Sequence, residues 1–170
     1  MKERRICLSL KPIIDILEEL LHLHVEFVDL SKTKTNVVKN GDVDTLSSII
    51  ARERKLSRKM EKVEKERQQY MATWFEANQP QKQEQTVTTL LSQVESEKDK
   101  EQLIELTTEL VRTMAQLKQQ EQLNRMLIQQ SLQFVHFSLD LMNPTIESMN
   151  YGTDKEKQVR TKQSLFDSKV

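Results

Sequence analysis

The three histidines are the side chains best suited to acid–base or metal chemistry, because imidazole titrates near neutral pH and binds zinc. His22 and His24 are two residues apart. On a helix they would point about 200° away from each other, since each residue turns a helix by about 100°. The pair therefore lacks the i, i+4 spacing of a shared metal site. His136 falls on the polar side of a helical pattern, where a solvated side chain is a simpler interpretation than an acid or base.

Carboxylates and nucleophiles give no stronger signal for catalysis. The chain has 26 Asp and Glu against 26 Lys and Arg, and the two signs alternate, so paired carboxylates are better explained as exposed ion pairs than as a catalytic dyad. The sequence also lacks a glycine-rich phosphate loop, a Cys-x-x-Cys motif and a nucleophile elbow. We predict a protein that is not an enzyme, with no catalytic residues, no metal and no cofactor.

Charge and hydropathy bear on the partners. A formal net charge of zero favours neither nucleic acid nor anionic lipid, and the basic residues between positions 52 and 62 are interleaved with glutamates. No run of about 18 apolar residues predicts membrane insertion. Cys7 is the only cysteine, so a reducing cytoplasm is the simplest location.

Composition predicts an all-α fold. Two glycines and three prolines are few for the turns of a β-sheet protein. Charged residues make up 31% and aromatic residues 5%, a balance typical of long helices and coiled coils. We expect an elongated antiparallel helical hairpin or bundle of three long helices, with one short helix and a flexible C-terminal tail.

Local signals divide the chain into a flexible N-terminus (1–8), a helical bundle (9–143) and a partner-binding tail (144–170). The helices are expected at about 10–39, 42–75, 86–94 and 96–142. Ser9 is the predicted N-cap of the first helix, Asn40 and Gly41 give it a left-handed end, and Asp42 caps the second. Proline and the loss of periodicity predict an exposed loop over 76–85.

The helix at 96–142 carries the clearest functional pattern. Its first half has one apolar stripe, formed by Leu103, Leu106, Leu110, Met114 and Leu117. A polar belt at 119–124 follows, and it either fixes the register of a coiled coil or marks where the bundle ends. In the second half, apolar residues cover roughly 240° of the circumference, and only Gln129, Gln133, His136 and Asp140 form a polar stripe.

The helix lengths differ. At about 1.5 Å per residue, the first two helices would be roughly 45 to 50 Å long and the helix at 96–142 about 70 Å. Part of the long helix should then lack an intramolecular partner along at least one face. Ordinary core packing or a homodimer contact would also explain the wide apolar arc.

The order and spacing of several segments resemble the FlgN family of flagellar export chaperones. The resemblance rests on paired leucines at 20–21, Asn-Gly-Asp-Val-x-x-Leu at 40–46, Glu-x-x-Glu-x-Glu-Arg at 61–67, Leu-Asp-Leu at 139–141 and Tyr-Gly at 151–152. It covers roughly residues 10 to 152.

The resemblance implies a cytoplasmic type III secretion chaperone. Such a protein binds the hook-filament junction proteins FlgK and FlgL, prevents their premature assembly and delivers them to the flagellar export gate. Helix-in-groove recognition needs anchors at helical spacing, which selects Leu132, Val135, Leu139 and Met142 of the long helix. Apolar tail residues would fold over the client, namely Ile146, Met149, Val159, Leu165 and Phe166. Tyr151 matches the family's tyrosine for docking at the export gate.

Two other classes of function fit parts of the pattern. One is a structural coiled-coil protein whose wide apolar arc forms its own dimer interface. The other is a histidine phosphotransfer bundle, which needs an exposed histidine such as His24 or His136. The lysine four residues after the histidine and the neighbouring glycine expected of that class are absent.

Overall fold

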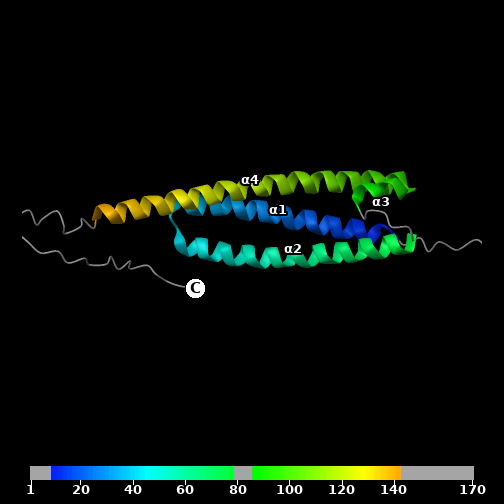
Figure 1. Cartoon of the computed structure of the whole chain (residues 1–170), viewed down its shortest axis with the longest axis horizontal. Coiled ribbons are helices and arrows are strands. Elements are labelled where there is room, and N and C mark those ends of the chain that lie inside the picture. Colours follow the sequence, from blue (N-terminus) through cyan, green and yellow to red (C-terminus); the bar gives the residue numbers. More distant parts are fainter. Residues whose placement is uncertain (1–8, 79–85, 143–170) are drawn as a thin grey trace, which may run out of the picture. The chain divides into compact units, whose positions relative to one another are not determined.

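The computed structural model describes residues 9–78 and 86–142, which form four α-helices and no strand. They are α1 (Lys11–Asn40), α2 (Val43–Asn78), α3 (Val87–Gln93) and α4 (Glu97–Met142) (Figure 1). The predicted all-α fold with three long helices and one short helix is confirmed. The chain divides into two compact units, Met1–Leu132 and Gln133–Val170. Of the second unit only the last turns of α4 are described, and the predicted N-terminal segment 1–8 and tail 144–170 lie outside the described residues.

The turn between α1 and α2 has the predicted chemistry. Gly41 adopts a left-handed conformation with φ of 69°, and its backbone N–H reaches the carbonyls of Val37 and Val38. Asp42 Oδ1 then accepts a hydrogen bond from the Thr45 N–H at 3.0 Å, which caps the start of α2. This tight connection reverses the chain direction.

The N-cap prediction for Ser9 was wrong. α1 begins one residue later than that prediction requires, with Leu10 at the N-cap and no side-chain cap. Ser9 Oγ instead accepts a hydrogen bond from the Lys11 N–H at 3.2 Å. Pro12 lies in the first turn, where an N–H has no acceptor within the helix.

The end of α2 also differs from the sequence expectation. The helix continues to Asn78, through the first residues of the predicted loop. Trp74 and Phe75 are buried and pack edge to face, with ring centroids 5.2 Å apart. The Asn78 side-chain amide donates to the Trp74 carbonyl at 2.9 Å. Burial of the aromatic pair holds the last turn in helical form.

α1 and α2 pack as an antiparallel hairpin. Tyr70 Oη donates to the Ser9 carbonyl at 3.0 Å, near the start of α1, and Lys34 near its other end pairs with Glu53 of α2. The core of the bundle contains buried residues from all four helices and the α3–α4 connection: Ile13, Ile14, Leu17, Leu20, Leu23, Leu56, Val63, Met71, Trp74, Phe75, Leu90, Val94 and Leu103. α3 supplies the fully buried Leu90.

α4 runs parallel to α1. Gln102 donates to Glu18 at 3.1 Å, and further along both helices Asn124 donates to the Ser31 carbonyl at 2.9 Å. The predicted stripe on α4 was wrong at one position, because Met114 is exposed whereas Thr113 is buried. A strict alternation of three- and four-residue steps from Leu103 reaches residue 113, so the stripe includes a polar residue that a search for apolar side chains passes over.

Candidate partner-binding surfaces

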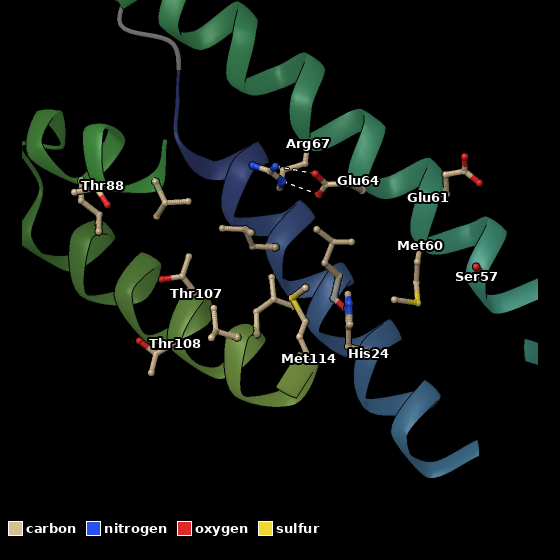
Figure 2. Close-up of a pocket in the computed structure, with 16 residues that line it drawn as sticks. His24, Ser57, Met60, Glu61, Glu64, Arg67, Thr88, Thr107, Thr108 and Met114 are labelled. Carbon is tan, nitrogen blue, oxygen red and sulfur yellow. Dashed lines mark hydrogen bonds and ion pairs between the residues drawn. The ribbon is translucent and has the colours of Figure 1, made fainter. Parts of the chain in front are cut away.

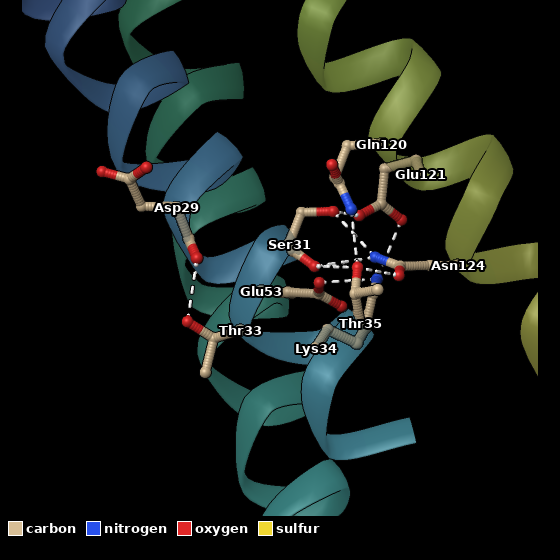
Figure 3. A network of polar contacts seen from close by, with 9 residues as sticks. All are labelled: Asp29, Ser31, Thr33, Lys34, Thr35, Glu53, Gln120, Glu121 and Asn124. Atoms are coloured by element: carbon tan, nitrogen blue, oxygen red, sulfur yellow. Dashed lines mark hydrogen bonds and ion pairs between the residues drawn. The ribbon is translucent and has the colours of Figure 1, made fainter. Parts of the chain in front are cut away.

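A cluster of polar side chains joins α4 to α1 (Figure 3). At its centre, Asn124 is almost fully buried. Its side-chain amide donates to the carbonyl and to the hydroxyl oxygen of Ser31, both at 2.9 Å. Thr35 Oγ1 donates to Asn124 Oδ1 at 2.6 Å, and Gln120 donates to Thr35 Oγ1 at 2.6 Å. Both ends of the buried amide are therefore hydrogen-bonded.

An ion pair extends this cluster to α2. Lys34 Nζ lies 2.8 Å from Glu121 Oε2 and 2.6 Å from Glu53 Oε1. Burial works against ionisation of Glu121, but hydrogen bonds from Lys34 and Ser31 and the lysine charge outweigh it, so the pKa of Glu121 lies below its ordinary value. We call these residues the polar cluster: Ser31, Lys34, Thr35, Glu53, Gln120, Glu121 and Asn124.

The polar cluster bears on the two interpretations of the belt at 119–124. Contacts of Gln120, Glu121 and Asn124 with α1 favour the register interpretation. Beyond Asn124, Met126 is exposed and Leu127 and Ile128 are half-buried, and from Leu132 onward the large apolar side chains are exposed. This change also agrees with the belt as the end of the packed region.

The last part of α4 is apolar and exposed. The four predicted anchors, Leu132, Val135, Leu139 and Met142, have exposed fractions from 51% to 81%. Their three- and four-residue steps place them along one stripe of the helix. We call residues 126–142 the α4 apolar segment. The predicted tail residues Ile146, Met149, Tyr151, Val159, Leu165 and Phe166 lie outside the described residues.

Other large side chains are exposed on further sides of this segment. Phe134, Phe137 and Leu141 have exposed fractions between 62% and 70%, and they fall on a different side of the helix from Leu139. An exposed apolar surface of this kind typically marks a protein–protein contact.

The structure also contains a groove that the sequence analysis missed. It lies within the first unit and has a volume of about 1050 Å³. Side chains from all four helices line it, including Leu20 and His24 of α1, Met60 of α2, Leu91 of α3 and Met114 of α4 (Figure 2). We call this the bundle groove. The signal that could have revealed it is Val111, an apolar residue outside the predicted α4 stripe that is also part of the lining.

The charged residues of the bundle groove lie on α2. Arg67 donates to Glu64 through Nε at 2.7 Å and Nη2 at 2.8 Å, and these bonds lower the pKa of Glu64 below its ordinary value despite partial burial. His24 Nδ1 lies 2.7 Å from the Leu20 carbonyl. A carbonyl only accepts hydrogen bonds, so Nδ1 carries the hydrogen.

Residues 9–78 and 86–142 contain no group of three or more His, Cys, Asp and Glu side chains placed to hold a metal ion. In the same ranges, no helix is both long and apolar enough to cross a membrane. The α4 apolar segment and the bundle groove are the two candidate surfaces for a partner.

Comparison with known proteins identifies the family. The FlgN protein family matches residues 1–158, nearly the whole chain. The chain belongs to the FlgN family. FlgN proteins are flagellar export chaperones, a class that agrees with an all-helical bundle carrying an exposed apolar surface.

One curated relative matches this FlgN-family chain along almost its full length. It is YvyG of Bacillus subtilis (strain 168), described as an uncharacterized protein, which is 29% identical over 165 residues. The match covers 96% of this chain and 100% of YvyG. No solved structure matches significantly.

Proposed function

We propose that this FlgN-family chain binds the hook-filament junction proteins FlgK and FlgL in the cytoplasm, prevents their premature assembly and delivers them to the export gate of the flagellar type III secretion system. The observation that carries this proposal is the exposed stripe of Leu132, Val135, Leu139 and Met142 on α4. A chaperone of this kind needs a scaffold with an apolar surface that binds a client and releases it, and it needs no active site.

The stripe suits an amphipathic client helix. Anchors at three- and four-residue steps are the pattern by which two helices interlock along their apolar faces. Fully burying one such side chain stabilises a complex by roughly 1.5 to 3 kcal/mol before the cost of association. Four anchors are therefore enough to dominate recognition.

The tail adds a second part to the proposed site. Its apolar residues, Ile146, Met149, Val159, Leu165 and Phe166, are too few to form a core alone, but they are suited to cover a client helix held on α4. Tyr151 is the residue proposed to dock at the export gate, as the family resemblance implies.

Substitutions in the stripe test the client site directly. We expect Leu139→Gln with Met142→Gln to weaken binding of purified FlgK and FlgL by roughly tenfold or more, measured by titration calorimetry. Val43→Gln is the control, since Val43 is an apolar residue at the start of α2 whose exposed fraction of 72% lies between those of Leu139 and Met142. An equal loss of affinity in the double variant and in Val43→Gln, or no loss of affinity in the double variant, would contradict the site.

A second candidate function is a structural coiled-coil protein that dimerises through the α4 apolar segment. Exposed apolar residues on more than one side of that segment favour it, Phe134 and Phe137 in particular. Light scattering over a range of concentrations separates the candidates. A tight dimer that Phe134→Gln with Phe137→Gln dissociates would support the structural role, whereas a monomer that binds junction proteins supports the chaperone.

A further inference from the structure

The bundle groove has the length and direction of one further helix packed against α1, α2 and α4. Its lining residues on α1 are Leu17, Leu20 and His24, three- and four-residue steps that follow one side of the helix. On α2 the lining runs from Ser57 to Arg67, a length of about 15 Å at 1.5 Å per residue. The groove therefore follows the helix axes and matches about three turns of an added helix.

The bottom and one wall of the groove are apolar. Leu17 and Leu20 form a buried floor, and Val111 and Met114 on α4 are exposed, at 66% and 48%. An occupant that covered these two side chains would remove apolar surface from water without requiring a change in the core.

The charged residues of the groove indicate which charge the occupant should carry beside α2. The charged side chains of the lining are two carboxylates, Glu61 and Glu64, and one guanidinium, Arg67, which leaves one negative charge without a counterpart in the lining. Arg67 is engaged by Glu64, and Glu61 has no ion pair with any other described residue. A lysine or arginine on the occupant would complement Glu61.

We propose that the bundle groove binds an amphipathic client helix of about three turns, with leucine-like anchors toward α1 and α4 and a basic residue toward Glu61. The inference rests on the proposed function, because the client supplies the helix. It adds a second client contact, on the bundle itself, to the one on the α4 apolar segment.

Two other occupants fit less well. The α4 apolar segment of a second copy carries Gln129, Gln133, His136 and Asp140 on its polar stripe, with no basic residue to face Glu61. This chain's own segment 155–166 is basic, but on a helix it would place only Val159 and Phe166 on one stripe.

A synthetic peptide tests the groove without depending on the client. The probe is an amphipathic helix of roughly 14 residues, about four turns, with leucines at three- and four-residue steps and lysines on one flank. We expect Val111→Gln with Met114→Gln in the full chain to weaken its binding by roughly tenfold or more, followed by fluorescence anisotropy. Ile104→Gln is the control, since Ile104 is exposed on α4 but does not line the groove, and its effect should stay within about twofold.

A charge reversal tests the basic flank. Glu61→Lys should weaken the lysine-flanked peptide and strengthen a glutamate-flanked one, while Glu66→Lys on another side of α2 should change neither. Equal affinities for the groove and control variants would overturn the proposal. Affinity that rises by roughly tenfold on deletion of residues 144–170, or a dimer that Val111→Gln dissociates, would assign the groove to the tail or to a second copy and also overturn it.

Binding of FlgK and FlgL to the same variants separates this inference from the proposed function. Failure of both proteins to bind the unaltered chain would contradict the proposed function, whatever the peptide does. Binding that is lost in Leu139→Gln with Met142→Gln but unchanged in Val111→Gln with Met114→Gln would contradict only the client contact in the groove. We expect both double variants to weaken binding.

Discussion

Asn124 and Lys34 determine how α4 meets the hairpin. A buried polar group is tolerated only when its hydrogen bonds are made, and Asn124 makes them with Ser31 and Thr35 of α1. A shift of α4 by one turn would break this set of hydrogen bonds. The polar cluster therefore gives the α1–α4 pair a single register, as a buried asparagine does in a coiled coil.

Replacement of Lys34 by methionine tests the ionic part of the cluster. The side chain is 8% exposed and its partner Glu53 is 14% exposed, so Lys34→Met leaves a buried carboxylate without its cation. We expect the free energy of unfolding to fall by about 3 kcal/mol, measured by urea denaturation. Lys32→Met removes an exposed ion pair with Asp29 and should cost about 0.5 kcal/mol or less. Similar losses of unfolding free energy in the two variants would show that the buried ion pair stabilises the fold no more than the exposed one.

Glu121 makes stability depend on pH. Its pKa in the folded protein lies below the ordinary value of 4.5, so the unfolded chain binds a proton more readily there. The stabilisation is present above pH 4.5 and is lost as the pH falls through the lower, folded pKa. We expect Glu121→Gln to flatten the acid side of the stability curve, followed by thermal unfolding between neutral pH and pH 3. An unchanged slope below pH 4.5 would contradict the assignment.

The helices differ in how their positions are fixed. α1 and α2 are joined by a three-residue signal, Asn40, Gly41 and Asp42, and their pairing follows from so short a connection. α4 is connected through α3 and residues 79–85, which lie outside the described residues, and its position depends on the core contacts of Leu103 and on the polar cluster. The groove between these elements is a consequence of packing that the hairpin turn does not determine.

Gly41→Ala tests the hairpin turn. The backbone at Gly41 is left-handed, with φ of 69°, and an added Cβ would meet no atom within 4 Å. The cost should therefore come from backbone conformation alone, about 1 kcal/mol of unfolding free energy. Gly41→Asn should cost less, because asparagine tolerates this conformation better. Chemical denaturation of the two variants measures the difference, and an alanine variant as stable as the unaltered chain would contradict the argument.

The whole molecule combines a folded bundle with a proposed client-binding tail. Deleting residues 144–170 should leave far-UV circular dichroism per folded residue nearly unchanged, since the described helices end at Met142. The same deletion should weaken binding of FlgK and FlgL by roughly tenfold or more, because the apolar tail residues would no longer cover the client. A truncated chain that binds as tightly as the full chain would remove the tail from the proposed site.

Local rules were sufficient for much of this protein. Composition and periodicity predicted the all-α fold, and the conformational preference of Gly41 and the side chain of Asp42 predicted the first turn. The common stripe of the four proposed anchors on α4 followed from spacing within one helix. Each of these features depends on residues that are neighbours in the sequence, so a pattern along the chain contains the information.

The tertiary structure decided which faces meet. Ser31 and Asn124 are far apart in the sequence, and no local pattern indicates that they share hydrogen bonds or that Lys34 pairs with both Glu53 and Glu121. The same holds for Thr113, buried in place of Met114, and for the bundle groove, whose lining comes from four helices. Periodicity states which residues of one helix share a side, but the partner of that side is set by the packing of distant segments against one another.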